Sequence, residues 1–269
     1  MAQERWQVSE AAASNYERVN VPGFFAAWAS ELLKRAALQS GERVLDVACG
    51  TGIVARGAVE QVGEGGVVTG VDLNVGMLTE AAKHVPAGFR IEWREADATE
   101  LPCGDAAFDV VLCQQGVQFF PEKALAVAEM HRVLASDGRV VVSVWRGLEH
   151  NAFPAIQSEA LARHLGAEFG TMMAAPFAYG DAGTFAALFR SAGFRDVKVE
   201  AVELTPTQSR EPERVAEKFL ALPMAETIAK MPDAARQAMI EDILSAIPGN
   251  PSDPAVLAPT SAHILTARR

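Results

Sequence analysis

The sequence predicts a doubly wound α/β fold, in which helices cover both faces of a largely parallel sheet, and three observations support this. Short apolar runs typical of strands alternate with helical patterns from residue 43 to residue 145. A glycine turn, Gly50-Thr51-Gly52, directly follows the first run and precedes a helical pattern. An aspartate stands at or just past the end of each of the first three runs. The carboxyl ends of parallel strands form the ligand-binding edge of such sheets.

The first half of the sheet is expected to be a βαβαβ unit with an amphipathic helix ahead of it. Apolar residues recur at helical spacing between Phe24 and Leu33, which predicts that leading helix. In the third strand, Phe89, Ile91 and Trp93 alternate and therefore share one face. The elements expected after the leading helix are strands at 43–48, 67–72 and 89–94 and helices that begin near residues 52 and 75.

The second half opens with the run 108–113, whose continuous apolar character predicts a strand buried on both faces. Proline suits the first turn of a helix, so we expect the next helix from about Pro121 to Leu134. The segment Ser136-Asp137-Gly138 predicts a turn into a fifth strand at 139–145.

Beyond the fifth strand, residues 147–180 are expected to leave the sheet as a helix, about 153–165, and a loop that contains Met, Ala and Pro. The remaining elements are expected to be a helix at 181–192, a strand at 197–204, helices near 211–222 and 233–246, a Pro- and Gly-rich stretch at 248–259, and a last strand near 263–267.

Composition excludes several classes of partner. The formal charge of -10, from 24 basic and 34 acidic residues, and the lack of a Lys/Arg run argue against nucleic acid. The cysteines Cys49, Cys103 and Cys113 lack C-x-x-C spacing, so we expect buried thiols and neither a metal site nor disulfides. No apolar stretch is long enough to span a membrane, and the N-terminus has no apolar signal core. These features predict a soluble, cytoplasmic protein.

The glycine turn allows the backbone to approach a ligand closely, and the acid before it indicates the charge of that ligand. Read as G-x-G-x-x-A through Ala55, the turn also fits a dinucleotide fingerprint, so an NAD-dependent oxidoreductase is one hypothesis. Asp46, four residues before Gly50, would repel a pyrophosphate but attract the ammonium and sulfonium of S-adenosylmethionine. No Tyr-x-x-x-Lys pair for hydride transfer is evident. The sequence therefore favours S-adenosylmethionine.

Two further aspartates fit an adenosine ligand. Asp72 closes the second strand about twenty residues after the glycine turn, where a carboxylate can accept hydrogen bonds from both ribose hydroxyls. Asp97 lies just past the third strand and can accept a hydrogen bond from an adenine amino group. Each aspartate alone is typical of a loop or cap, but three at successive strand ends indicate a site.

On these residues the chain resembles the class I S-adenosylmethionine-dependent methyltransferases, in the broad group that includes the ubiquinone and menaquinone C-methyltransferases. The matching segments are Val44-Leu45-Asp46-Val47-Ala48-Cys49-Gly50-Thr51-Gly52, Val71-Asp72-Leu73 with Met77, Asp97-Ala98 before Leu101-Pro102, Phe108-Asp109-Val110-Val111, and Met130-His131-Arg132-Val133-Leu134 with Gly138-Arg139. The resemblance is firm over about residues 40–146. It implies methyl transfer and a Rossmann-like sheet of seven strands whose last strand, suited to 262–268, is antiparallel.

The resemblance also implies which residues hold the cofactor. It assigns the methionine moiety to Asp46, Gly50 and Gly52, in a motif that includes Ala48, the ribose to Asp72, and the adenine to Leu73, Met77, Asp97 and Ala98. Tyr16 belongs to the segment that covers the cofactor in relatives, and we expect it to contact the cofactor carboxylate. Gln114 is expected to contact the cofactor, and the alternative is that it satisfies loop backbone groups.

Two residues are candidates for orienting or deprotonating the methyl acceptor. Gln115 lies where relatives place the methyl group and the acceptor, and its amide can orient either of them. His150 follows the fifth strand on the same edge, and its unperturbed pKa suits a general base, although an exposed loop histidine is the alternative. The glutamines at 114 and 115 replace the Asn-Pro-Pro-aromatic motif of enzymes that methylate nucleobases or glutamine amides, which argues against those substrates.

We therefore expect a single domain with added segments. Its parts are an N-terminal helical lid at 1–40, a cofactor-binding core at 41–146, and insertions at 147–180 and 206–259 that form a cap or shape the acceptor pocket. The Phe, Met, Ala and Leu content of the insertions predicts an apolar or aromatic acceptor. The methylated atom (C, O or N) and the choice between monomer and homodimer stay open. A non-catalytic S-adenosylmethionine-binding module is the other hypothesis.

Overall fold

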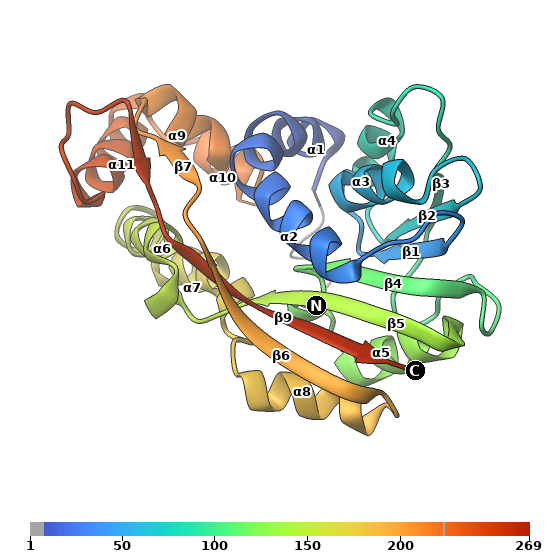
Figure 1. The fold of residues 1–269 in the computed structure, drawn as a ribbon. Helices are drawn as coiled ribbons and strands as arrows, with labels where there is room; N and C mark the ends of the chain where they lie inside the picture. Colours follow the sequence, from blue (N-terminus) through green and yellow to red (C-terminus); the bar gives the residue numbers. More distant parts are fainter. Residues whose placement is uncertain (1–7, 223) are drawn as a thin grey trace.

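The computed structural model describes residues 8–222 and 224–269, so the first seven residues of the expected lid lie outside the described residues. Within these ranges the chain forms a seven-stranded sheet (Figure 1). In spatial order the strands are β3 (Glu92–Glu95), β2 (Val67–Asp72), β1 (Arg43–Val47), β4 (Phe108–Gln114), β5 (Leu134–Trp145), β9 (Thr260–Arg268) and β6 (Arg195–Leu204). Strands β1 to β5 pair in parallel, and β9 runs antiparallel to its neighbours β5 and β6. The predicted fold, including the antiparallel last strand, is confirmed.

Helices cover both faces of the sheet, because its central strands are apolar on both sides. Figure 1 shows α2 (Ala26–Ala36), α3 (Ile53–Val62) and α4 (Val75–Lys83) above the sheet, with α5 (Lys123–Val133) and α8 (Ala182–Ser191) below it. Within β4, Val110 packs in the core beneath α2 and α3, whereas Val111 packs in the core with α5 and α8. The fully buried Trp28 of α2 donates its indole N–H to Thr260 Oγ1 at 3.3 Å, which satisfies its polar atom.

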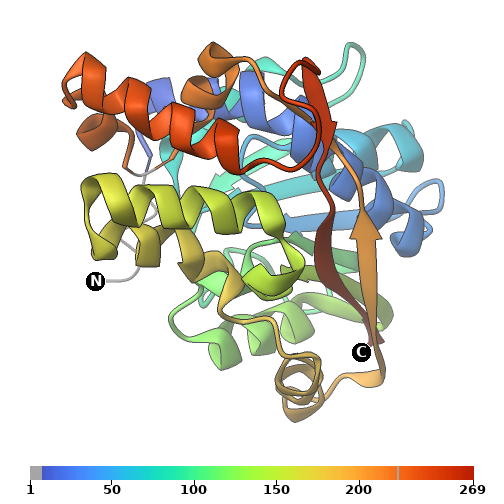
Figure 2. The ribbon, with the colours of Figure 1, turned by 90° about the vertical axis from the view of Figure 1, so that its left-hand side faces the viewer.

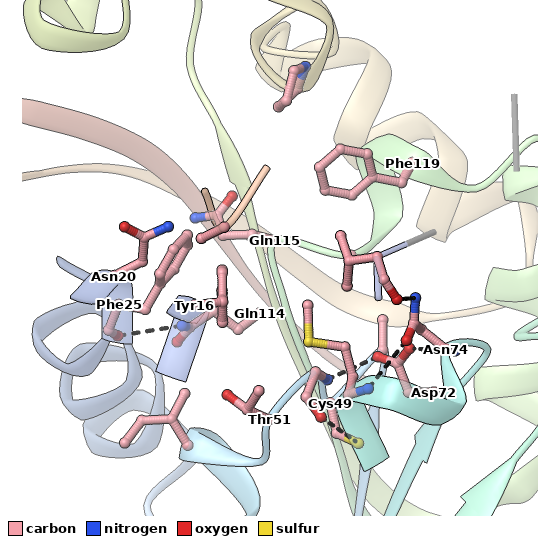
Figure 3. Close-up of a pocket in the computed structure, with 18 of the residues that line it drawn as sticks. Tyr16, Asn20, Phe25, Cys49, Thr51, Asp72, Asn74, Gln114, Gln115 and Phe119 are labelled. Atoms are coloured by element: carbon pink, nitrogen blue, oxygen red, sulfur yellow. Dashed lines mark hydrogen bonds between the residues drawn. The ribbon is translucent and has the colours of Figure 1, made fainter. Parts of the chain in front are cut away.

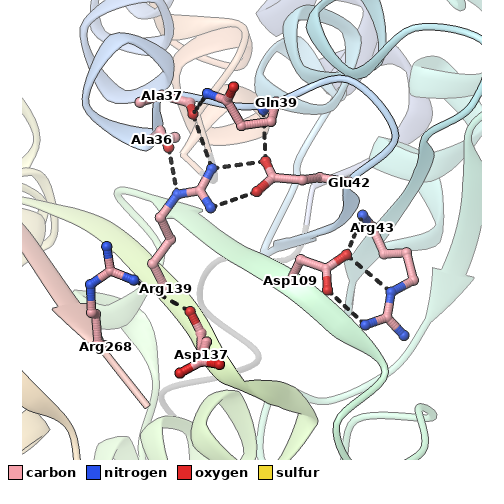
Figure 4. Close-up of polar contacts among 9 residues, drawn as sticks. All are labelled: Ala36, Ala37, Gln39, Glu42, Arg43, Asp109, Asp137, Arg139 and Arg268. Carbon is pink, nitrogen blue, oxygen red and sulfur yellow. Dashed lines mark hydrogen bonds and ion pairs between the residues drawn. The ribbon is translucent and has the colours of Figure 1, made fainter.

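Polar contacts at the amino edge of the parallel strands fix the end of α2 (Figure 4). Arg139 of β5 donates to the carbonyl oxygens of Ala36 at 2.6 Å and Ala37 at 3.1 Å, and it pairs with Glu42 at 2.7 Å. These contacts satisfy carbonyl groups that the end of a helix leaves without partners. Because α2 is held at this edge, the segment before it runs back across the opposite, carboxyl edge.

Beyond the carboxyl edge, the segments after β5 and β6 form one helical cap. It contains α6 (Ala152–Leu165), α7 (Ala167–Ala174), α9 (Pro212–Phe219), α10 (Ala225–Ala229) and α11 (Asp233–Ala246), with a small ribbon of β7 (Thr207–Ser209) and β8 (Ala255–Leu257). Figure 2 shows α6 and α11 side by side. Phe153, Leu161, Phe219 and Met239 share a buried core that is separate from the two cores of the sheet. The cap therefore has apolar packing of its own.

Local structure departs from the sequence predictions in several places. The expected loop after α6 contains the helix α7, and the expected Pro- and Gly-rich stretch contains β8. The third strand begins at Glu92, although Phe89 and Ile91 still pack against the core beneath α2 and α3. The expected turn 136–138 is a bulge inside β5, where pairing passes from Phe108–Leu134 to Val110–Arg139.

The segment ahead of α2 also differs from the expected single helix. A short helix α1 (Glu10–Asn15) leads into a π-helix, Tyr16–Phe25, which contains Pro22. Proline cannot donate a backbone hydrogen bond and disturbs the regular α-helical ladder, and π-helical turns occur often at functional sites. No helix in the described ranges is long and apolar enough to cross a membrane.

Candidate functional site

A cavity of about 360 Å³ lies at the carboxyl edge of the parallel strands, between the sheet, the N-terminal segment and the cap (Figure 3). It brings together most of the residues that the sequence singled out. Those that line it are Tyr16, Asp46, Ala48, Gly50, Asp72, Leu73, Met77, Asp97, Ala98, Gln114 and Gln115. Gly52 and His150 are not among the lining residues. The convergence follows from the topology, because parallel strands end at one edge.

The glycine loop after β1 has a left-handed backbone at Ala48 (φ 55°), Gly50 (φ 54°) and Gly52 (φ 83°). Asp72 holds this loop to β2, because its carboxylate accepts hydrogen bonds from the backbone N–H of Gly50 and of Asn74, both at 2.8 Å. A left-handed alanine is strained, and such strain is concentrated at binding sites. The loop is therefore shaped before a ligand arrives.

The two glycines of the loop have different roles. A Cβ added at Gly50 would meet no atom within 4 Å, so this position leaves free space on the cavity side. A Cβ added at Gly52 would lie 2.5 Å from the Trp93 ring of β3. Gly50 thus permits the approach of a ligand, whereas Gly52 permits packing of α3 against β3.

Substitution should separate these roles. We expect Gly52→Ala to lower the free energy of unfolding by at least about 2 kcal/mol, since it adds overpacking against Trp93 to a left-handed backbone. Gly50→Ala has only the backbone cost, about 1 kcal/mol. Urea unfolding of both variants measures the difference. Equal losses would show that Trp93 moves freely and that Gly52 has no packing role.

Asp46 places a buried carboxylate beside the cavity. Its side chain is buried, and Oδ2 accepts a hydrogen bond from the Ala55 N–H at 3.1 Å, but Oδ1 has no partner among the described residues. Burial raises the pKa of Asp46 to about 8, and the nearby Asp72 carboxylate adds to the effect. A buried carboxylate without a counter-ion is costly, so this end of the cavity fits a cationic ligand.

The neighbouring end of the cavity fits a nucleoside. Burial also raises the pKa of Asp72, against the opposing hydrogen bonds from Asn74 and Gly50. Asp97 Oδ1 accepts hydrogen bonds from the Thr99 N–H and Oγ1, both at 2.8 Å, which fixes its carboxylate beside the cavity. Leu73 lines the same region, and it is 37% exposed, so an apolar surface is available to a flat ring.

The π-helix covers the cavity and is tied to the glycine loop. Glu17 pairs with Arg56 of α3 at 2.6 Å, and Arg56 also donates to the Thr51 carbonyl oxygen at 2.5 Å. Burial raises the pKa of the Tyr16 hydroxyl, and the Glu17 and Asp72 carboxylates raise it further. Tyr16 therefore lines the cavity as a neutral phenol.

Gln114 and Gln115 lie at the end of β4, between the loop and the cap. Gln114 Nε2 donates to the Phe25 carbonyl oxygen at 3.3 Å, so this side chain does satisfy a backbone group. Its Oε1 is buried without a partner, as is Nε2 of Gln115, among the residues that the structure describes. Gln115 Oε1 accepts from Gln118 Nε2 at 3.4 Å. Both glutamines thus retain a polar atom for a ligand.

The cap half of the cavity contains residues that the sequence reasoning missed. Trp145 and Phe177 stack with ring centroids 5.8 Å apart, and both line the cavity together with Phe153. Lys218 of α9 and Gln157 of α6 add polar groups there. No local motif marks Lys218, because its helix has an ordinary amphipathic pattern. This half of the cavity suits an apolar or aromatic molecule with a polar substituent.

The general-base hypothesis for His150 is not supported by its position. The turn after β5 places its ring outside the cavity, with Nε2 2.7 Å from an Arg146 guanidinium nitrogen and 3.5 Å from Glu149. Its side chain is 37% exposed. In this arrangement Nε2 accepts a hydrogen bond from the guanidinium of Arg146. His150 therefore lies where the alternative, an exposed loop histidine, would place it. No group of three or more metal-ligating side chains occurs within 8–222 and 224–269.

Comparisons with known proteins agree with this geometry. The family described as "Methyltransferase domain" matches residues 44–138. Demethylmenaquinone methyltransferase from Lysinibacillus sphaericus is 35% identical over 138 residues, which is 50% of this chain and 59% of that protein. The protein of the same name from Alkalihalophilus pseudofirmus is 29% identical over 210 residues, 72% of this chain and 89% of its own.

The fold is shared with solved structures. Phosphoethanolamine N-methyltransferase 2 from Haemonchus contortus, in complex with S-adenosyl-L-methionine, superposes with a TM-score of 0.62 at 20% identity. The match covers 97% of this chain and 57% of that one. The chain thus spans only part of the length of some of these proteins.

Proposed function

We propose that the chain is a class I S-adenosylmethionine-dependent methyltransferase, as its sequence relatives indicate, and that it transfers the methyl group of S-adenosylmethionine to an apolar or aromatic small molecule. The observation that carries this proposal is the unpaired, buried carboxylate oxygen of Asp46 in a cavity that extends from the glycine loop to the aromatic side chains of the cap. The curated relatives that act on demethylmenaquinone, as their name states, support an aromatic acceptor.

The residues at the sheet edge fit S-adenosylmethionine in charge and shape. Asp46 would face the cationic methionine end, Asp72 the ribose, and Asp97 the adenine edge. When bound, S-adenosylmethionine supplies a methyl group on a positively charged sulfur. A pyrophosphate would instead meet the buried carboxylate of Asp46, which argues against NAD.

The chain itself contributes alignment and exclusion of water. The Glu17–Arg56 pair, with side chains 12–13% exposed, holds the π-helix over the glycine loop. The free Nε2 of Gln115 can donate to an oxygen of the acceptor. Displacement at a sulfonium needs a nucleophile in line with the methyl group more than it needs acid catalysis, so alignment in a dry cavity supplies a large share of the rate.

Binding and turnover test the proposal in two steps. Calorimetric titration should give one-site binding of S-adenosylhomocysteine and none of NAD. Incubation of the protein and S-adenosylmethionine with a panel of hydroxylated naphthalenes and benzenes should then give a methylated product, detected by mass. Binding of NAD alone would refute the cofactor. Binding of S-adenosylhomocysteine without turnover of any compound in the panel would favour the non-catalytic module.

A further inference from the structure

The charges that line the cavity are separated between its two halves. The carboxylates of Asp46, Asp72 and Asp97 come from the sheet edge. Among the described lining residues, Lys218 is the one basic side chain, and it comes from α9 of the cap. The negative end is explained by the cationic cofactor. The positive group at the other end, Lys218, has no role in binding the cofactor in this assignment.

Lys218 is held in an apolar surrounding, and none of the described residues is its counter-ion. Its Nζ donates to Gln208 Oε1 of β7 and lies 4.9 Å from the centroid of the Phe153 ring. No carboxylate within 8–222 and 224–269 forms an ion pair with it. Burial lowers the pKa of Lys218 to about 8. Burial of an unpaired ammonium costs free energy. We therefore expect Lys218 to pair with an anionic group of a ligand that enters the cavity.

The neighbours of Lys218 keep its ammonium beside the cavity. Gln208 is 3% exposed and also lines the cavity, and β7 is paired with β8. On α9, Val215 and Phe219 are fully buried in the cap core, which fixes the helix. Lys218 lies on the same helix one residue before Phe219, and its amine reaches the aromatic side chain of Phe153 at the acceptor half.

We propose that Lys218 binds an acidic hydroxyl of the acceptor and holds it as the anion, a phenolate or an enolate. This inference rests on the proposed function and narrows its substrate class to hydroxylated aromatic or enolic molecules. When the amine is neutral, the hydroxyl proton passes to Nζ, and an ammonium–oxyanion pair forms with no other change in bonding. Such a pair is a charge-assisted hydrogen bond in a largely apolar surrounding. The anion is a stronger nucleophile than the parent hydroxyl.

The experiment uses 4-nitrophenol, whose anion absorbs in the visible, and its neutral methyl ether 4-nitroanisole as the matched ligand. Both are titrated into the full chain saturated with S-adenosylhomocysteine, at a pH where free 4-nitrophenol is mostly protonated. We expect wild type to bind 4-nitrophenol as the phenolate, seen as a gain in visible absorbance. Lys218→Met should lose this band and bind 4-nitrophenol at least about tenfold more weakly, with 4-nitroanisole unaffected.

Lys230→Met is the control variant, because Lys230 is a cap lysine whose side chain is 79% exposed and does not line the cavity. It should behave as wild type. Phenolate binding by Lys218→Met equal to wild type would overturn the inference. If Lys218→Met does not fold, the inference is tested by the spectrum of 4-nitrophenol with the wild-type protein. Binding of 4-nitrophenol in its neutral form, or no binding of it, would overturn the inference. Failure to bind S-adenosylhomocysteine would instead refute the proposed function itself.

Discussion

Asp72→Ala is expected to weaken binding of S-adenosylhomocysteine by at least about 100-fold, or about 3 kcal/mol. Two effects combine. The variant loses the carboxylate that we assign to the ribose hydroxyls, and charge-assisted hydrogen bonds are the stronger kind. It also loses the acceptor for the Gly50 and Asn74 N–H groups, both at 2.8 Å, which hold the glycine loop in its left-handed conformation.

Calorimetric titration measures this loss, and Glu95→Ala provides a matched control. Glu95 is the register partner of Asp72 on β3, at the same edge of the sheet, but it is exposed and does not line the cavity. Its removal should change the dissociation constant by no more than about twofold. An affinity of Asp72→Ala that matches the control would refute the assignment of the ribose to Asp72.

The pH dependence of S-adenosylmethionine binding is expected to follow Asp46. Burial raises the pKa of this carboxyl to about 8 in the free protein, well above its ordinary value. A cation favours the ionised form, so below about pH 8 binding must release a proton. Affinity should therefore rise with pH, by up to roughly thirtyfold between about pH 6 and about pH 7.5.

The stability of the free protein should change in the opposite direction. A carboxyl whose pKa is raised by folding contributes stability below its unfolded-state value, and this contribution is lost as the pH rises through the folded-state value. The contribution of Asp46 to the free energy of unfolding should thus fall between about pH 4 and about pH 8 in wild type. Asp46→Asn removes the titrating group, so in this range both of its profiles should differ in slope from those of wild type by this contribution. Parallel profiles for the variant and wild type would show that Asp46 is not the group responsible.

The sequence by itself determined the sheet and the group of residues that meet at its carboxyl edge. Strands such as β4 are recognisable because residues that alternate between two buried faces must all be apolar, as Val110 and Val111 are. The glycine loop and the aspartates Asp46 and Asp72 could be predicted as a group, because the parallel topology brings successive strand ends to one edge. These features depend on local pattern and on chain order alone.

Only the tertiary structure decided which side chains face the cavity elsewhere. Gly52 looked equivalent to Gly50 in the sequence, but Trp93 from β3 occupies the space beside it. His150 follows β5 at the correct edge, yet the turn directs its ring to Arg146. Lys218 belongs to an unremarkable amphipathic helix, and it reaches the cavity because α9 packs on the distant α11 and beside Phe153 of α6. Side-chain direction in such segments is set by contacts between residues far apart in the chain, which no local pattern records.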